Sequence, residues 1–220
     1  MKLTLRSEAP MLFVIALMFA AAAMSWNQVP ELLPTHWNAA GEVDGTGGRG
    51  MGLLFLPIIT LFSYLLTAFI PRIDPGRANI EKFAGPYNLF RLAFVLFMAG
   101  IYAAMHATFR GFDINMTMVL MPLMGMLFVT VGWMLRHVQP NWSIGIRTPW
   151  TLTSRLAWDR SHRLGSKLFM IAGLFFVLTG IIGKPWAIGV AVGGMILVTF
   201  ILIGYSYVVW KGDPDRVPPR

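Results

Sequence analysis

Two clusters of polar side chains in this 220-residue sequence could do chemistry. The first places His36 close to Glu42 and Asp44, so that one imidazole and two carboxylates fall within nine residues. Such groups can bind a divalent metal or act together as acid and base. No recognised metal spacing such as His-Glu-x-x-His is present, so a metal site is only weakly indicated. The plainer interpretations are an ordered cap, or a surface that meets something arriving from outside.

The residues around this first cluster are turn formers. Asn38 and Asp44 are predicted to cap turns through their side chains, and Gly41 and Gly45 are predicted to adopt positive φ. The glycine-rich stretch 45–50 lacks the Lys-Ser/Thr of a phosphate-binding loop. The candidate sensing or binding residues of this loop are Pro34, His36, Trp37, Asn38, Gly41 and Asp44.

The second cluster, residues 141–163, is dense in Trp, Thr and Arg. Thr153 or Ser154 is predicted to cap a helix that runs into the next apolar segment. On that helix Asp159 precedes Arg163 by four positions, which favours an ion pair. The plainer interpretation is an interfacial helix whose arginines face anionic lipid. The candidate residues are Asn141, Trp142, Gly145, Arg147, Thr148, Pro149, Trp150, Thr151, Leu152, Trp158, His162 and Arg163.

The elements that position these clusters must be apolar helices. The chain is 56% hydrophobic and only 13% charged, whereas an ordinary soluble domain is about 25% charged. This composition excludes a disordered chain, a fibrous protein and an ordinary soluble enzyme, and the absence of cysteine excludes disulfides, thiolate zinc sites and a cysteine nucleophile. A membrane-spanning helix needs about 20 apolar residues. Segments that meet or approach this length are 11–26, 51–70, 90–109, 117–135, 167–183 and 185–210.

The sequence therefore predicts an all-α, polytopic membrane protein with six transmembrane helices. The first segment is the shortest and is expected to need its flanks, out to about Gln28. Its basic start and small residues also resemble a signal peptide, but Glu8 argues for an uncleaved helix. Only Lys184 and Pro185 separate the last two segments, which predicts a tight helical hairpin.

The orientation follows from where the basic residues fall. With the N-terminus in the cytoplasm, 15 of the 18 Lys and Arg residues lie on the cytoplasmic side. Only Arg49, Arg110 and Lys184 remain outside. Both termini are thus predicted to be cytoplasmic, with the first cluster outside and the second inside. The net charge of +8 is explained by topology, and no direct nucleic-acid partner is expected.

The span interiors offer few ionisable groups. His106 is expected to be an interfacial histidine bonded to a neighbour or to water, and Arg91 is expected to extend toward the headgroups. The lack of a charge within the membrane argues against an ion-coupled transporter. Gly189, Gly193 and Gly194 are expected to pack the fifth and sixth helices closely.

Both clusters resemble motifs of the SdpI family, bacterial membrane proteins that include an immunity factor against a killing peptide. The stretch from Leu33 to Asn38, followed by Gly41 and Asp44, is similar to the family's companion domain of unknown function, Pro-x-His-aromatic-Asn-x-x-Gly-x-x-Asp. The Lys that often follows the Asp is absent, and Arg49 is the nearest base. The second cluster is similar to the family's signature and is the more specific match. The resemblance covers most of residues 11–210.

The expected organisation is an N-terminal part at 1–89, an SdpI-like part at 90–211 and a disordered tail at 212–220. The resemblance implies a multi-pass protein of the bacterial cytoplasmic membrane with no cofactor and no assigned catalytic residue or metal. Its implied partners are the lipid bilayer, a toxin peptide outside and a transcriptional regulator inside. The leading hypothesis is an immunity or resistance protein against an extracellular membrane-active peptide that also signals inward.

Two alternatives remain. The first is a transporter or exporter of a small amphipathic molecule, supported by a weak inverted repeat of three spans plus three. The second is a membrane-embedded metal-dependent enzyme, with His36, Glu42, Asp44 and His106 converging outside. An enzyme is the less favoured of these interpretations.

Overall fold

The computed structural model describes residues 4–217 and is built around long helices. Six of its helices are long and apolar enough to cross a membrane, within the residues described. The prediction of an all-α protein with six spans is therefore confirmed. They are α1 (Leu5–Ser25), α2 (Arg49–Ile73), α4 (Ala84–Phe109), α5 (Met116–Leu135), α7 (Arg155–Ile182) and α8 (Pro185–Lys211).

The remaining elements are short and lie between the spans. Strands β1 (Leu32–Trp37) and β2 (Val43–Gly48) form an antiparallel hairpin that was not predicted. The helices α3 (Arg77–Glu81) and α6 (Pro149–Leu152) are single turns.

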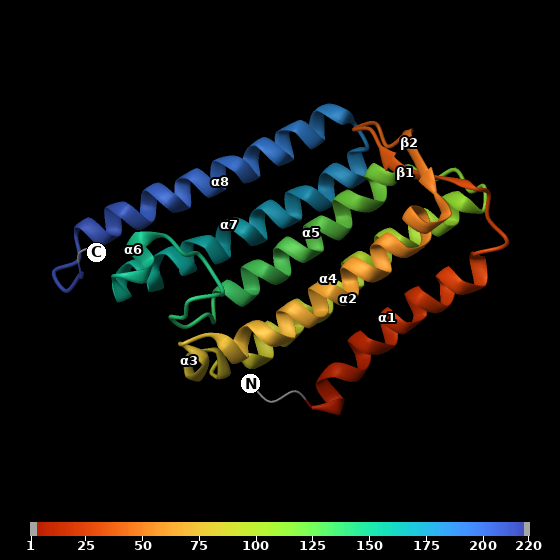
Figure 1. The fold of residues 1–220 in the computed structure, drawn as a ribbon. Helices are drawn as coiled ribbons and strands as arrows, with labels where there is room; N and C mark the ends of the chain where they lie inside the picture. The colour runs from red at the N-terminus through yellow and green to blue at the C-terminus, as the bar shows by residue number, and fades with distance from the viewer. Residues whose placement is uncertain (1–3, 218–220) are drawn as a thin grey trace.

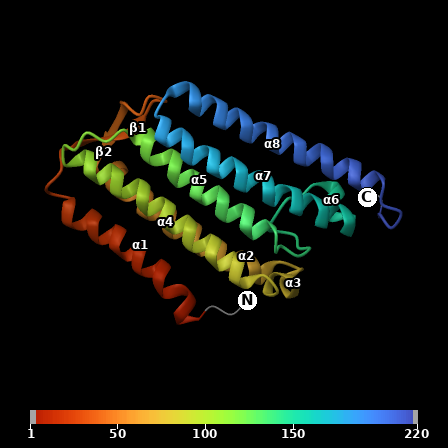
Figure 2. The same ribbon diagram turned by 180° about the vertical axis from the view of Figure 1, so that it is seen from behind.

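The long helices α4, α5, α7 and α8 lie side by side in a row, and α2 lies across one face of α4 (Figures 1 and 2). The helix α1 packs on α2 and α4, α4 packs on α5, and α7 lies between α5 and α8. The β-hairpin covers one end of the helix bundle, which we call the hairpin end (Figure 1). The opposite end, which we call the cap end, carries α3, α6 and the ends of the described chain (Figure 1). The two polar clusters therefore lie at opposite ends of the bundle.

Local signals in the sequence set the helix boundaries. The helix α1 begins after a capping box made by Thr4 and Ser7 and ends at Ser25. It is therefore lengthened at its N-terminal end, and not toward Gln28 as predicted. Ser154 caps α7 as predicted, through its hydroxyl and the backbone N–H of Ala157. The predicted helical hairpin is confirmed, because Gly183 ends α7 at φ +62° and α8 begins two residues later.

Glycines bring α5 and α7 into close contact. A Cβ added to Gly125 would lie 2.4 Å from the carbonyl oxygen of Gly173, and one added to Gly132 would lie 2.7 Å from that of Ser166. Small residues allow this approach of two helix backbones. The expected packing role of Gly189, Gly193 and Gly194 is wrong, because a Cβ there meets open space. The helix α8 instead packs through another face, which includes Ala187, Ala191 and Leu202.

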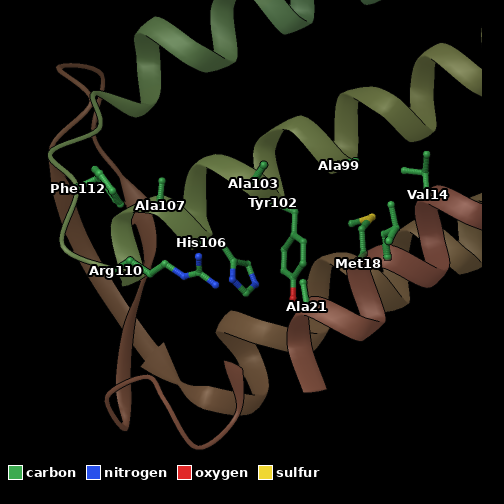
Figure 3. A pocket seen from close by; sticks show the side chains of 11 residues that line it. Val14, Met18, Ala21, Ala99, Tyr102, Ala103, His106, Ala107, Arg110 and Phe112 are labelled. Atoms are coloured by element: carbon green, nitrogen blue, oxygen red, sulfur yellow. The ribbon is translucent and has the colours of Figure 1, made fainter. Parts of the chain in front are cut away.

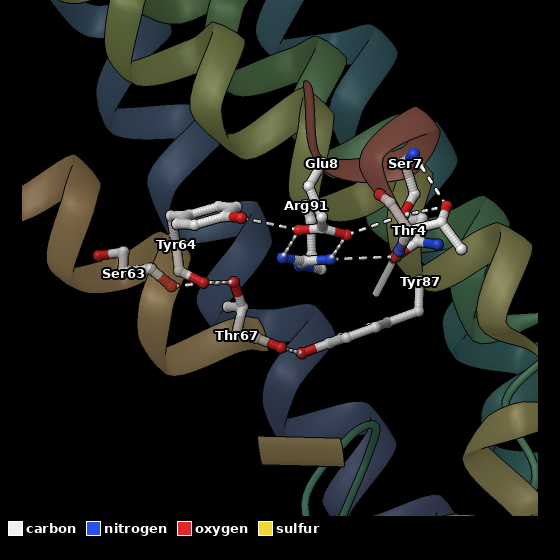
Figure 4. A network of polar contacts seen from close by, with 9 residues as sticks. Thr4, Ser7, Glu8, Ser63, Tyr64, Thr67, Tyr87 and Arg91 are labelled. Carbon is white, nitrogen blue, oxygen red and sulfur yellow. Dashed lines mark hydrogen bonds and ion pairs between the residues drawn. The ribbon is translucent and has the colours of Figure 1, made fainter. Parts of the chain in front are cut away.

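Arg91 does not extend toward the headgroups, and this expectation was wrong. Its side chain is 1% exposed and forms a two-pronged ion pair with Glu8 of α1, with nitrogen–oxygen distances of 2.8 and 3.1 Å (Figure 4). The Tyr64 hydroxyl of α2 donates to the same carboxylate at 2.9 Å. The expectation that no charge lies within the spans is therefore also wrong. The partner was missed because Glu8 lies 83 positions before Arg91.

The chain after α8 is more ordered than expected up to Val217. The Ser154 hydroxyl donates to the Asp213 carboxylate, and this bond, with the N–H of Asp215, holds the pKa of Asp213 below its usual range. The N–H of Val217 donates to the carbonyl oxygen of Thr153 at 3.0 Å. The expectation of a disordered tail fails for these residues because they bind the start of α7. Residues 218–220 lie outside the described part.

Candidate functional site

The loop that carries the first cluster is a β-hairpin with an asparagine-closed tip. The Asn38 side-chain oxygen accepts hydrogen bonds from the N–H groups of Ala40 and Glu42, at 2.9 and 3.1 Å. Gly41 has φ +83°, so the predicted roles of Asn38 and Gly41 are confirmed. Gly45 does not have positive φ. It pairs with His36 across the strands, where an added Cβ would lie 2.9 Å from the His36 Cβ, so it is needed for space.

His36 and Asp44 form an exposed pair across this hairpin. The His36 Nδ1 lies 2.5 Å from Asp44 Oδ1, and their side chains are 71% and 43% exposed. The predicted turn-capping role of Asp44 is wrong, because its carboxylate faces the opposite strand. Glu42 bonds Asn38 instead of His36. Within residues 4–217 no three His, Cys, Asp or Glu side chains are placed to share a metal ion. The His36 imidazole and the Asp44 carboxylate thus offer a hydrogen-bond donor and acceptor to a molecule that contacts the hairpin.

The hairpin is anchored on two spans. The Asn115 side-chain N–H donates to the carbonyl oxygen of Ala40 at 2.8 Å, and a Cβ on Gly41 would collide with Asn115. Leu33 is fully buried against Gly52 of α2. Trp37 is half-buried against the apolar cluster that includes Leu33 and Leu53. The role of Asn115 was missed, although an Asn just before an apolar segment is a helix-capping signal and Asn115 also caps α5.

The second cluster folds into a compact cap that begins with a turn closed by Asn141. Its side-chain oxygen accepts from the N–H groups of Ser143 and Ile144, and its N–H donates to the carbonyl oxygen of Ile144. Gly145 follows at φ +112°, where an added Cβ would lie 2.4 Å from the His162 Nε2. Glycine is therefore required both for the backbone conformation and for the close approach of the ring.

His162 holds this cap onto α7. Its Nδ1 faces the carbonyl oxygen of Trp158 at 2.8 Å, and its Nε2 faces the N–H of Ile146 at 3.0 Å. One nitrogen must donate and the other must accept, which assigns the neutral Nδ1–H tautomer. The Trp158 ring is buried, stacks on His162 at 4.2 Å and donates its N–H to the carbonyl oxygen of Val138. Both side chains are structural supports.

The segment from Arg147 to Leu152 is a docked helical turn. Thr148 and Thr151 form a reciprocal capping box with Pro149 in the first turn. The Thr148 hydroxyl lies 3.0 Å from that of Ser206 on α8, and the Trp150 ring packs 5.2 Å from the Tyr207 ring. This folding accounts for much of the density of distinctive side chains in the cluster.

The cap is also tied to the loop after α2, through a residue that sequence reasoning missed. Asp74 is buried and accepts from the N–H of Trp142 at 3.1 Å and from the Ser143 hydroxyl. Asn79 donates to the carbonyl oxygen of Pro140 at 2.8 Å. The available signal was an Asp directly before Pro-Gly, which is a turn sequence.

Several side chains of the cluster remain on the surface of the cap, among them Pro149, Arg155 and Arg160. Trp142 is 60% exposed, Leu152 and Arg163 are exposed, and Arg147 is exposed while donating to the carbonyl oxygen of Trp142. The predicted Asp159–Arg163 pair is not formed, because Asp159 binds Arg155 at 3.0 Å. The exposed cap surface thus combines apolar side chains with several guanidinium groups.

Comparison with known proteins matches each cluster separately. Residues 137–209 match the SdpI/YfhL protein family, and residues 13–61 match a domain of unknown function, DUF1648. The chain is 19% identical over 200 residues to the immunity protein SdpI of Bacillus subtilis (strain 168). That alignment covers 91% of this chain and 94% of the relative. No solved structure matches the chain. The resemblance stated from the two motifs is confirmed, and the chain is a multi-pass protein of the cell membrane.

Proposed function

We propose that this chain, whose residues 137–209 match the SdpI/YfhL protein family, is an immunity or resistance protein against a membrane-active peptide outside the cell. The hairpin end meets the peptide, and the cap end passes the bound state to the cytoplasm or binds a regulator there. The proposed orientation, with both termini inside, rests on the uneven distribution of Lys and Arg.

The observation that carries this proposal is that the β-hairpin and the cap lie at opposite ends of the helix bundle (Figure 1). The hairpin carries the exposed His36–Asp44 pair and also the exposed apolar side chains Leu32 and Val43. A surface of this kind offers both hydrogen bonds and apolar contact to an amphipathic peptide.

At the cap end the exposed groups suit a protein partner. Exposed Trp142, Arg147, Leu152 and Arg163 lie on a scaffold in which Asn141, Thr148, Thr151 and His162 are buried and hydrogen-bonded. Tryptophan and arginine are enriched at the energetic centres of protein interfaces. We therefore assign regulator binding to this surface, and peptide contact to the hairpin.

The test is survival of a sensitive bacterial host challenged with membrane-active peptides. Wild-type protein is expected to raise survival, and His36→Ala and Arg147→Ala are each expected to lower the protection at equal membrane abundance. Thr46→Ala on the hairpin and Arg72→Ala at the cap end are matched controls, because both side chains are exposed. Wild-type protein that protects against none of the peptides would contradict the proposal.

Transport is the second candidate, because the buried Glu8–Arg91 pair places charges within the spans. Both charges are engaged with each other, which makes them poor coupling sites and ranks transport lower. Proteoliposomes distinguish the two functions. Accumulation of an amphipathic substrate, unaffected by His36→Ala, would favour transport over immunity.

A further inference from the structure

A groove lies between α1 and α4 near the hairpin end, with a volume of about 430 Å³ (Figure 3). This volume falls within the usual range for small-molecule sites, about 300–1,000 Å³. One wall is formed by Val14 and Met18 of α1, and the other by Ala99 and Ala103 of α4. The small alanine side chains leave the space open, and both walls belong to membrane-spanning helices.

Two nitrogen-bearing side chains without partners lie at one end of this groove. The Nε2 of His106 is buried and has no hydrogen-bond partner within residues 4–217, which differs from the bonded interfacial histidine expected from the sequence. Its ring is held edge-on against Tyr102 at 4.5 Å. Arg110 follows one turn later, at the end of α4, and forms no ion pair with the described acidic residues. Figure 3 shows the Arg110 side chain extending toward the His106 ring.

The other polar group of the groove is already satisfied. The Tyr102 hydroxyl donates to the carbonyl oxygen of Leu53 at 2.8 Å. The groove is thus apolar along most of its length. At one end it carries the positive charge of Arg110 and the unbonded Nε2 of His106. Phe112 lies exposed at that end, where an aromatic ring suits the boundary between hydrocarbon and headgroups.

We propose that this groove binds an anionic phospholipid. Its acyl chain lies between α1 and α4, and its phosphate sits at Arg110 with His106 Nε2 as a hydrogen-bonding neighbour. An arginine binds phosphate through charge-assisted hydrogen bonds, and a basic side chain near the membrane surface attracts anionic lipid. An extended peptide fits less well, because its backbone needs a row of polar partners and the lining offers only these two free groups. This inference holds independently of the immunity function.

Fluorescence quenching by brominated lipids tests the site in the full-length protein. The chain has no cysteine, so Leu96→Cys introduces a single site for a bimane label. Leu96 is 49% exposed and lies two turns from Ala103 on the same face of α4, outside the groove lining. The labelled protein is placed in phosphatidylcholine vesicles that contain a small fraction of brominated phosphatidylglycerol, brominated phosphatidylcholine or brominated stearate.

Brominated phosphatidylglycerol is expected to quench at a concentration about fivefold lower than brominated phosphatidylcholine, as for one basic side chain beside an anionic headgroup. Arg110→Gln is expected to remove this preference. Lys184→Gln, which deletes an exposed charge at the same end, is expected to keep it. Ala103→Trp should fill the groove and weaken quenching by both phospholipids.

Three results would overturn the proposal. They are equal quenching by the two phospholipids in the otherwise wild-type protein, a preference that persists in Arg110→Gln, and an Arg110-dependent preference for stearate without one for phosphatidylglycerol. The last result would assign the groove to a fatty acid. A bimane label at Val190→Cys, exposed on α8, reports the bulk lipid and should show no dependence on Arg110.

Discussion

At the residue scale, the ion pair between Glu8 and Arg91 fixes the position of α1. It is more buried than the other two ion pairs found among the described residues. The carboxylate also accepts from Tyr64 and Ser7, so the negative charge has several partners (Figure 4). A buried charge that loses its partner costs far more than the pair gains over an apolar contact. The pair therefore constrains which helix can lie against α4.

The first prediction concerns this pair. Glu8→Ala and Arg91→Ala are each expected to lower the free energy of unfolding by about 3–5 kcal/mol, because each leaves an unpaired buried charge. The double variant Glu8→Leu with Arg91→Met is expected to recover most of that loss. Unfolding in detergent measures all three variants, with Arg72→Ala as an exposed control. A double variant whose loss of stability equals the sum of the two single losses would contradict this, because it would show that the cost does not come from leaving one charge unpaired.

A second prediction separates two glycines by their surroundings. Gly145→Ala is expected to destabilise the cap by about 1–3 kcal/mol, because φ is +112° and the new Cβ would meet the His162 ring. Gly204→Ala on α8 meets open space and is expected to be neutral or slightly stabilising. Protease cleavage within the cap loop, residues 139–154, reports the difference. Equal resistance of both variants would argue against the tight contact between the loop and His162.

Residues whose partners are close in sequence were predicted well. Asn38, Gly41 and Ser154 act within a few positions, and turn and capping rules cover that range. Asp74 binds Trp142 from 68 positions away, and no spacing rule links the two. The predicted partner of Asp159, Arg163, was wrong for a different reason. Both Arg155 and Arg163 lie four positions from it, and helix periodicity alone does not choose between them.

At the scale of elements, the six spans were predictable because an apolar run of membrane length has few alternatives. The start of α7 extends well before its apolar part, since the mixed polar and apolar residues 155–166 continue the helix from the Ser154 cap. The strands were missed because β2 is mostly glycine and polar, with little alternation. Their pairing is supported by the contact of the hairpin tip with Asn115, which is a tertiary feature.

The third prediction tests which glycines join helices. Gly125→Leu is expected to destabilise the protein by at least about 1–3 kcal/mol, because the side chain would enter the backbone of α7. Gly193→Leu is the matched control on α8, where open space surrounds the position. Thermal unfolding in detergent should show a large shift for the first variant and little for the second. The reverse order would place the close helix contact on α8 instead.

At the scale of the whole molecule, the proposed function depends on which end faces the outside. An even number of spans puts both ends of the chain on one side, as the shared position of the described termini at the cap end shows (Figure 1). The choice of side rests on 15 basic residues against three. If the hairpin end faced the cytoplasm, the His36–Asp44 pair could not meet an external peptide.

The fourth prediction settles this orientation by labelling. The cysteine-free chain accepts single cysteines at Thr46, exposed on the hairpin, and at Arg147, exposed on the cap. A membrane-impermeant maleimide is expected to label Thr46→Cys in intact cells, because the basic cap end is retained in the cytoplasm. Arg147→Cys should be labelled only after permeabilisation. Labelling of Arg147→Cys in intact cells would show the opposite orientation, with the cap end outside. The hairpin could then not contact external peptides, and peptide contact would be assigned to the cap.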